Sequence, residues 1–200
     1  MSSSEPDFPP PDFVVVDVET ACARSSSICQ IGIVAFRDGR EVLAWESLVD
    51  PRDEFSAFNT RIHGIAAHHV DGAPCFAQVH HIVDAYLSGR LTVAHSSFDR
   101  HALARACAVH ERDGIATRWI DSVTVARRAW PHLPNHKLGT LARHLGLDHR
   151  HHDALSDARA AGHVVLHAIA ETGVALADWL NPPPRRKRLR ETREDATPPA

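Results

Sequence analysis

The chain of 200 residues lacks a long hydrophobic run, and no apolar stretch approaches the roughly 20 residues that a membrane-spanning helix needs. Residues 1–11 also lack the basic segment followed by an apolar one that marks a secretory signal. They are rich in Ser, Pro and acidic residues, and we expect them to form a disordered leader. These two absences predict a cytoplasmic protein that does not act at a membrane.

Cysteine is scarce as well. None of the four cysteines forms a CxxC pair, so we expect free thiols in a reducing compartment. Histidine is abundant, with 16 residues, but neither an HExxH motif nor a Cys/His finger spacing is present. Pairs such as His68-His69 and His80-His81 therefore do not indicate a zinc site, and we expect most histidines to be surface or weakly structural residues.

The chain has no strong net charge, but its charge is unevenly distributed. The total is −3; residues 182–200 carry six basic and three acidic residues, a net of +3, which leaves −6 for the rest. With 44% hydrophobic residues, residues 12–180 are expected to form one folded domain. We expect residues 181–200 to be a Pro-rich, basic, disordered tail, either a phosphate-binding arm or a passive solubilising end.

Hydrophobic periodicity predicts a mixed α/β architecture. An Asp-Gly turn at residues 38–39 suits an antiparallel hairpin, whereas residues 55–70 show no regular pattern. Three strands, then alternating helices and strands, then helices are typical of a mixed sheet covered by helices. The predicted strands are 13–18, 28–36, 41–49, 91–94 and 118–120, and the predicted helices are 77–87, 99–110, 121–130, 137–145 and 153–171.

Three short clusters carry acidic residues and histidine at the ends of these elements. The clusters are residues 16–20, 95–99 and 152–158. Side chains two apart on a strand share a face, so Asp17 and Glu19 point the same way. Two carboxylates on one face of a buried strand repel each other unless a cation is present. Asp99 follows a second strand, at the rim where ligands bind in parallel sheets.

Each member of the later clusters also has a purely structural interpretation. Asp99 and Asp153 fit helix N-caps, Asp157 fits a solvated helix face, and His152 is one histidine among many. Taken together, the carboxylates form a set suited to hard divalent ions such as Mg²⁺ or Mn²⁺, which prefer oxygen ligands. Two ions held by shared carboxylates are suited to phosphodiester cleavage. The set is Asp17, Glu19, Asp99 and Asp157, with His152 as a proton acceptor.

In this order and spacing, the clusters resemble the three motifs of the DEDDh 3′–5′ exonucleases, which include the proofreading epsilon subunit of bacterial DNA polymerase III and ribonuclease T. The motifs match at residues 17–20 (Asp-Val-Glu-Thr), at Phe98-Asp99, and at residues 152–158 (His-x-Ala-x-x-Asp-Ala). Secondary marks occur at residues 30–32, 62–65 and 138–147. The resemblance covers about residues 11–173. It departs at Ala21-Cys22, where many relatives have Thr-Gly next to the 3′-terminal base.

The resemblance implies a ribonuclease H-like fold with a five-stranded mixed sheet. It also implies two Mg²⁺ or Mn²⁺ ions per site, bound by the four carboxylates, and His152 as the general base. A pocket for the terminal nucleotide would be lined by Thr20, His63 and Phe98. The implied partner is a single-stranded nucleic-acid 3′ end, from which nucleoside 5′-monophosphates are released. A polymerase or repair partner is compatible with this resemblance but is not identified by it.

The sequence is compatible with three functions. The first is a 3′–5′ exonuclease of the proofreading or repair type acting on DNA. The second is an RNA-trimming 3′–5′ exoribonuclease, because the sensing of a 2′-hydroxyl depends on contacts that no motif locates. The third is a non-catalytic nucleic-acid-binding relative, which the presence of all five chemical residues disfavours.

Overall fold

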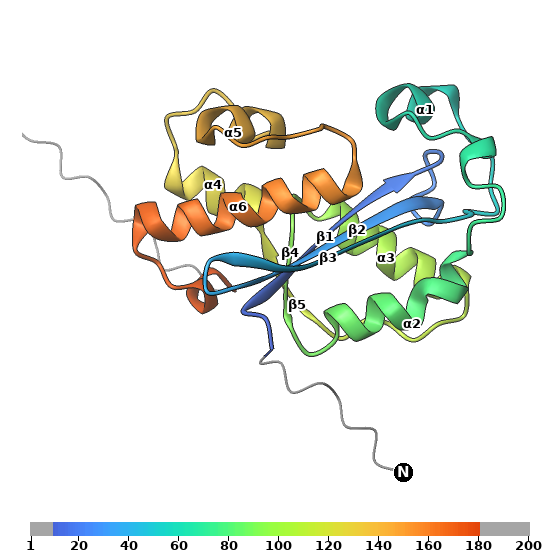
Figure 1. Ribbon diagram of the computed structural model, residues 1–200, viewed down its shortest axis with the longest axis horizontal. Helices are drawn as coiled ribbons and strands as arrows, with labels where there is room; N and C mark the ends of the chain where they lie inside the picture. The colour runs from blue at the N-terminus through green and yellow to red at the C-terminus, as the bar shows by residue number, and fades with distance from the viewer. Residues whose placement is uncertain (1–9, 181–200) are drawn as a thin grey trace, which may run out of the picture.

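The computed structural model describes residues 10–180; the predicted tail and residues 1–9 of the predicted leader lie outside the described residues. A five-stranded sheet in the order β3-β2-β1-β4-β5 forms the centre of the fold (Figure 1). β2 is antiparallel to both β1 and β3, and β4 is parallel to β1 and β5. The predicted mixed sheet is confirmed. The strands are β1 (Phe13–Thr20), β2 (Ile28–Arg37), β3 (Arg40–Leu48), β4 (Leu91–Ala94) and β5 (Arg118–Asp121).

The turn between β2 and β3 has the conformation that the Asp-Gly pair predicts. Asp38 has φ 51° and Gly39 has φ 72°. A two-residue hairpin turn whose twist matches the strands needs positive φ at both positions, which Asp tolerates and Gly readily adopts.

Helices cover both faces of the sheet (Figure 1). Every helix predicted from periodicity is present within one or two residues of its expected bounds. These helices are α2 (Phe76–Leu87), α3 (Phe98–Val109), α4 (Ser122–Ala129), α5 (Leu138–Leu145) and α6 (Ala154–Thr172). Alternate residues of β1 divide between two apolar cores: Val14, Val16 and Val18 pack with α2 and α3, whereas Phe13 and Val15 pack with α4, α5 and α6.

The prediction of an irregular segment at residues 55–70 was wrong. This segment contains helix α1 (Ala57–His63) and the short 3-10 helix η1 (Ala67–His69). The helix begins where the Ser56 hydroxyl accepts a hydrogen bond from Asn59 N (3.1 Å) and ends at Gly64, which has φ 79°. α1 buries none of its residues, so it lacks the core-facing apolar stripe by which periodicity detects a helix. A second 3-10 helix, η2 (Leu176–Leu180), was also not predicted.

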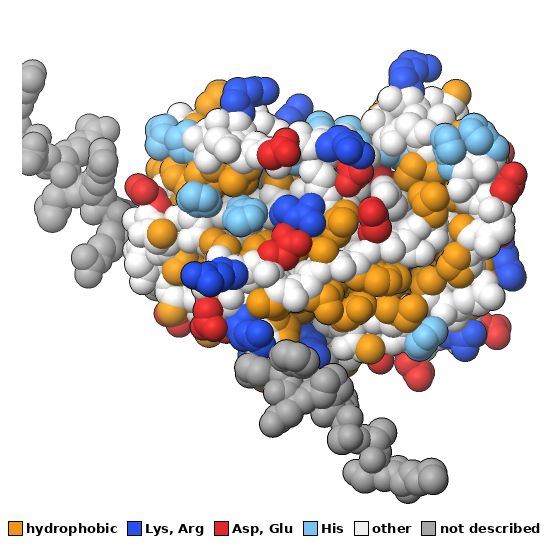
Figure 2. Space-filling view, viewed as in Figure 1, with side chains coloured by type: hydrophobic (Ala, Val, Ile, Leu, Met, Phe, Trp, Pro, Cys, Tyr) orange, Lys and Arg blue, Asp and Glu red, His pale blue; other side chains and the backbone are white. Residues whose placement is uncertain are grey.

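The surface carries no large area of one charge on the face shown in Figure 2, where acidic, basic and histidine side chains are interspersed. Among residues 10–180, no helix is both long and apolar enough to cross a bilayer.

The first turn of α6 lies directly on β2. A Cβ atom built on Gly32 would lie 2.4 Å from the backbone of Ala154 and Leu155, so this position has room only for glycine. Next to it, the Gln30 side-chain Oε1 accepts a hydrogen bond from Ala154 N (3.2 Å). Gly32 pairs with Asp17 across the strands. The absence of a side chain at Gly32 therefore lets α6 approach the end of β1.

This close contact predicts a specific cost for one added methyl group. Gly32→Ala should lower the free energy of unfolding by at least about 1–3 kcal/mol, the usual cost of overpacking, because rigid backbone stands in the way. Chemical denaturation followed by circular dichroism measures the change. Gly139→Ala, on α5 with nothing within 4 Å of the built Cβ, is the matched control and should be neutral or stabilising. Equal stability of the Gly32 variant and the wild type would contradict the packing argument.

Candidate active site

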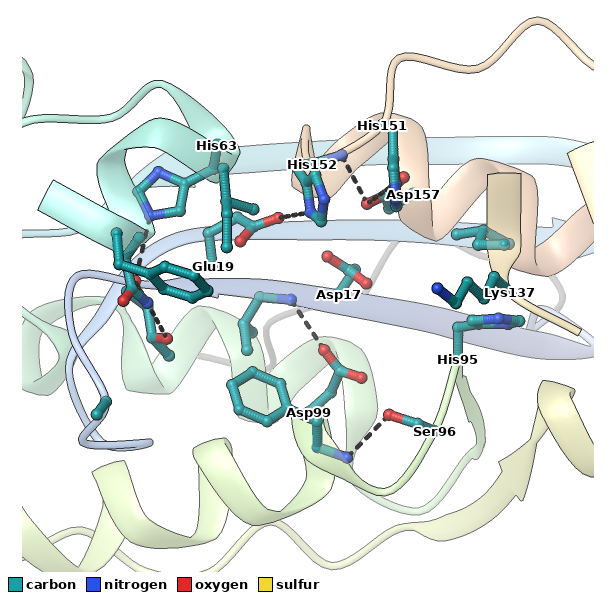
Figure 3. A pocket seen from close by; sticks show the side chains of 18 of the residues that line it. Asp17, Glu19, His63, His95, Ser96, Asp99, Lys137, His151, His152 and Asp157 are labelled. Atoms are coloured by element: carbon teal, nitrogen blue, oxygen red, sulfur yellow. Dashed lines mark hydrogen bonds and ion pairs between the residues drawn. The ribbon is translucent and has the colours of Figure 1, made fainter. Parts of the chain in front are cut away.

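A cavity of about 540 Å³ opens where the carboxyl ends of β1 and β4 meet the starts of α3 and α6 (Figure 3). A volume of this size suits a mononucleotide-sized ligand. Helix α1 and the residue before α5 complete its wall. All eight predicted site residues line this one cavity: Asp17, Glu19, Thr20, His63, Phe98, Asp99, His152 and Asp157.

The carboxylates of β1 point toward α6. Asp17 and Glu19 continue the row of Phe13 and Val15, which faces the core under α6. The strand pairing places Asp17 opposite Gly32 and Glu19 opposite Gln30, the two residues on which α6 rests. In Figure 3, Asp17 accordingly lies in the middle of the labelled acidic residues. Asp17 and Glu19 therefore share one face of β1, as strand geometry predicts, and this face is the one covered by α6, which carries the third motif.

Asp99 enters the site from the other layer. It is in the first turn of α3, and its Oδ1 atom accepts a hydrogen bond from Val18 N (3.1 Å). The interpretation of Asp99 as an N-cap is wrong, because Ser97 is the capping residue of that helix. The hydrogen bond instead ties α3 to the strand that carries Asp17 and Glu19.

Asp157 is held by the loop before its own helix. Its Oδ2 atom accepts a hydrogen bond from His152 N (3.0 Å), and its Oδ1 atom contacts Nε2 of His149. Asp157 is buried, so it is not part of a solvated helix face. Asp153 does cap the helix, since its Oδ1 accepts from Ser156 N (2.9 Å). The structural interpretation is thus confirmed for Asp153 and wrong for Asp157.

His152 has an unusual backbone and a central position. Its φ of 62° is rare for a residue with a side chain and is the kind of strain found at functional sites. Its ring stacks on His151 at a centroid distance of 3.8 Å, and its Nδ1 lies 3.7 Å from Glu19 Oε1. Burial and the neighbouring His151 lower the pKa of His152, so the ring is neutral and able to accept a proton near pH 7.

The crowding of four acids perturbs their ionisation. Burial, together with the charges of Asp99, Asp157 and Glu19, raises the pKa of Asp17 well above its usual value. Burial first, and then Asp157 and Asp99, raise the pKa of Glu19 to about 8. Burial raises the pKa of Asp99 to about 7, although the hydrogen bond from Val18 N works against it. Carboxylates in this state gain strongly from a nearby cation.

The donor set fits hard divalent cations. The carboxylate oxygens of Glu19 and Asp157 and a ring nitrogen of His152 lie within 4.8 Å of one another. Asp17 and Asp99 border the same cavity. Lys137 is the one Lys or Arg among the described residues that line it, so little positive charge offsets the carboxylates once they ionise. Oxygen donors with this net charge are the ligands that Mg²⁺ and Mn²⁺ prefer.

Two of the residues predicted to contact a nucleotide, Thr20 and His63, are joined by a hydrogen bond. His63 Nδ1 accepts from Ile65 N (3.0 Å), which leaves Nε2 to donate to Thr20 O (3.2 Å). Burial lowers the pKa of His63, in keeping with a neutral ring. Phe98 is 45% exposed at the mouth of α3. Cys22 also lines the cavity, at the departure from the family pattern.

Sequence reasoning missed two groups of lining residues. The first lies on α1, where Phe58 is 68% exposed and Ile62 stands four residues later on the same helix face. The Ser56 cap and the Gly64 stop were the signals for this helix. The second group is His95 and Lys137: His95 donates to His136 O (3.1 Å), accepts from the Ser122 hydroxyl (2.8 Å), and so joins β4 to the segment before α5.

Residues 14–165 match a family model, RNase_T, described as "Exonuclease". Among relatives, the DNA polymerase III PolC-type of Streptococcus thermophilus strain LMD-9 is 34% identical over 158 residues, and that of Latilactobacillus sakei strain 23K is 31% identical over 159 residues. These matches cover 76% and 77% of this chain but 11% of each relative. The chain therefore corresponds to a small part of each of these proteins.

Solved structures share the fold. Exonuclease X in complex with 5′-overhanging duplex DNA has a TM-score of 0.68 at 24% identity and covers 84% of this chain and 99% of that one. Exonuclease I in complex with an inhibitor has a TM-score of 0.73 at 14% identity, over 83% and 42%. A 3′-exonuclease that recognises the 3′ end of a histone mRNA stem-loop has a TM-score of 0.68 at 18% identity, over 82% and 84%. The predicted ribonuclease H-like fold is confirmed.

The raised pKa values predict how stability depends on pH in a metal-free buffer. In the unfolded chain Asp and Glu have pKa values of about 4, so the folded state holds extra protons at Glu19 and Asp99. This stabilisation is complete below about pH 4 and decreases progressively as the pH rises. The contribution of Asp99 is lost as the pH passes about 7, and that of Glu19 as it passes about 8. The melting temperature in EDTA should therefore fall between about pH 6.5 and 8.5.

Glu19→Gln provides the control, because glutamine does not titrate and the histidines outside the cavity are the same in the two proteins. The variant should show a shallower fall over the same range, measured by thermal unfolding at matched ionic strength. A melting temperature that rises over this range, or identical slopes for the two proteins, would show that Glu19 is not a protonated acid in the metal-free fold.

Proposed function

Since this chain belongs to the exonuclease family, in the DEDDh class of 3′–5′ enzymes, we propose that it removes nucleoside 5′-monophosphates from single-stranded 3′ ends of DNA. One observation carries this proposal: the four carboxylates and His152, which lie in three distant parts of the sequence, line a single cavity large enough for a nucleotide.

The choice of DNA is supported by the relatives. The proteins that are 34% and 31% identical to this chain are DNA polymerases III. The second candidate is RNA trimming, which is favoured by the likeness to the 3′-exonuclease that recognises a histone mRNA stem-loop. The two functions differ in the sugar of the terminal nucleotide, because only RNA offers a 2′-hydroxyl to the protein.

The carboxylates would hold two divalent ions, Mg²⁺ or Mn²⁺. When bound, such ions neutralise charge on the phosphodiester and favour attack by water. The chain's own contribution is the geometry: Val18 N fixes Asp99, His152 N fixes Asp157, and the contact at Gly32 fixes the distance between β1 and α6. The ligand set is Asp17, Glu19, Asp99 and Asp157.

His152 would act as the general base. A neutral imidazole accepts a proton from the attacking water, and Glu19, whose oxygen lies 3.7 Å from its Nδ1, would stabilise the cation that forms. The left-handed backbone at His152 directs its N–H to Asp157 while its ring lines the cavity.

The terminal nucleotide would occupy the side of the cavity formed by α1 and α3. Exposed aromatic rings stack on bases at about 1–3 kcal/mol per base without much sequence preference. Phe98 and Phe58 are the rings available for stacking, and Thr20 and His63 line the same cavity. The acidic domain would thus bind its substrate through ions and stacking rather than through a basic surface.

A DNA polymerase is the partner class that the relatives favour, since each of them contains its matching segment within a polymerase III protein. The four cysteines are buried and unpaired, which suits the reducing cytoplasm as the place of action.

The proposal predicts a strict metal requirement. Labelled single-stranded DNA should be shortened from its 3′ end with Mg²⁺ or Mn²⁺ and not in EDTA, and matched RNA and duplex substrates identify the preferred nucleic acid. Asp17→Asn should reduce turnover at least about 100-fold, because even outer partners of metal sites are worth about 10–100-fold. Asp71→Asn, an exposed acid outside the cavity, is the control. Cleavage that persists in EDTA would exclude the two-ion site.

The role of His152 as general base predicts how far turnover falls when its ring is removed. His152→Ala is expected to lower turnover by roughly 10²–10⁴-fold at saturating metal, the usual contribution of a general base. His151→Ala should have a smaller effect, and the remote, exposed His144→Ala should have none. Single-turnover rates at fixed pH measure all three variants. A larger loss in the His151 variant than in the His152 variant would transfer the proposed role to His151.

A further inference from the structure

The loop before α6 places two additional imidazoles beside Asp157. His149 and His151 are separated by one residue. Nε2 of His149 contacts Asp157 Oδ1, and Nδ1 of His151 lies 3.7 Å from Asp157 Oδ2. The two rings are 5.3 Å apart between centroids. One donor atom from each of the three residues lies within 4.8 Å of the other two.

This arrangement is specific to the third motif. All 16 histidines lie within the described residues, and only two sets of three potential ligands occur there, both of which include Asp157. The pairs that stand out in the sequence, His68-His69 and His80-His81, belong to neither set. The abundance of histidine thus yields a clustered ligand set only next to the acidic cavity.

The chemistry of this set differs from that of the four carboxylates. Two imidazole nitrogens and one carboxylate oxygen suit a borderline ion such as Zn²⁺, whereas Mg²⁺ prefers oxygen alone. Three protein ligands leave a fourth position for water in a tetrahedral site. The His149 side chain is 6% exposed and that of His151 is 53% exposed, so one ligand is shielded from solvent while the other borders the cavity through which an ion would enter.

We propose that His149, His151 and Asp157 form a binding site for Zn²⁺ or a chemically similar ion. Binding would replace the proton on Nε2 of His149, which now points at the carboxylate, by the ion itself. The site shares Asp157 with the oxygen ligands of the proposed function but uses two residues that lie outside that set.

A consequence that rests on the proposed function is inhibition by zinc. The four ionised carboxylates carry a charge of −4, which two divalent ions already balance. A third divalent ion at Asp157 would therefore be repelled at short range by the two bound ions. Zn²⁺ and the two ions of the active centre should therefore exclude one another, and zinc should inhibit the enzyme in the presence of magnesium.

Direct binding tests the site without any need for activity. ZnCl₂ is titrated calorimetrically into the metal-free full chain and into His149→Asn, His151→Asn and His144→Asn. His144 is exposed, lies 5.9 Å between centroids from the His132 ring, and controls for a histidine in another close pair. Zinc also enters the carboxylate centre of the metal-free chain. We therefore expect a tight binding phase in the wild type and in the control that is weakened at least about tenfold in the other two variants, as even outer partners of metal sites contribute about 10–100-fold.

Circular dichroism and the metal-free melting temperature identify any variant that fails to fold. If the buried His149 variant does so, His151→Asn decides the question, because the His151 side chain is half-exposed. Unchanged zinc affinity in His151→Asn, or a folded His149→Asn that loses activity but binds zinc normally, would overturn the proposal and leave His149 as a hydrogen-bond partner of Asp157.

Inhibition is measured separately, as the Zn²⁺ concentration that halves exonuclease activity at a fixed, saturating Mg²⁺ concentration. His151→Asn should raise that concentration at least about tenfold. Equal inhibition of the wild type and His151→Asn would overturn the link to the active centre. Absence of activity with every divalent ion would instead refute the proposed function, and the calorimetric result would still judge the zinc site.

Discussion

The contact between the first turn of α6 and the backbone of β2 is the constraint on which the site depends. Gly32 has no side chain, so the helix reaches the sheet, and Gln30 anchors its first free N–H group. Because Gly32 pairs with Asp17 and Gln30 with Glu19, the same contact sets the separation between the acids of β1 and Asp157. Residues 30–32, which belong to the secondary motifs of the resemblance, therefore have a structural role: they position α6 against the sheet.

The four carboxylates are brought together at an electrostatic cost that the rest of the fold offsets. Apolar cores on both faces of the sheet hold β1, α3 and α6 in place, while N–H groups of Val18 and His152 support Asp99 and Asp157. Without a cation, the result is a set of acids that retain protons into the neutral range, as the raised pKa values of Glu19 and Asp99 show. Cations and protons thus compete for one cavity, and the histidines around Asp157 add nitrogen donors to that competition.

Most elements were predictable because their signals are local. Residues 91–94 form a buried strand as expected, and the Asp-Gly turn joins β2 to β3. Helix α1 was missed because its apolar side chains do not pack into a core. Phe58 is exposed and lines the cavity instead. His149 was missed for a different reason, since nothing in its spacing from Asp157 distinguishes it from the other histidines until the loop before α6 turns back on the helix.

By itself the sequence determined the order of the five strands and of helices α2 to α6, the antiparallel start of the sheet, and the identity of the acids that now border the cavity. These features depend on side-chain periodicity, on turn residues and on the donor chemistry of single residues. Only the tertiary structure decided which groups meet. The hydrogen bonds between Val18 and Asp99 and between Ala154 and Gln30 join residues 81 and 124 positions apart, and the placement of Phe58, Lys137 and His149 follows from such contacts. Long-range packing sets these distances, and no local pattern in the chain encodes them.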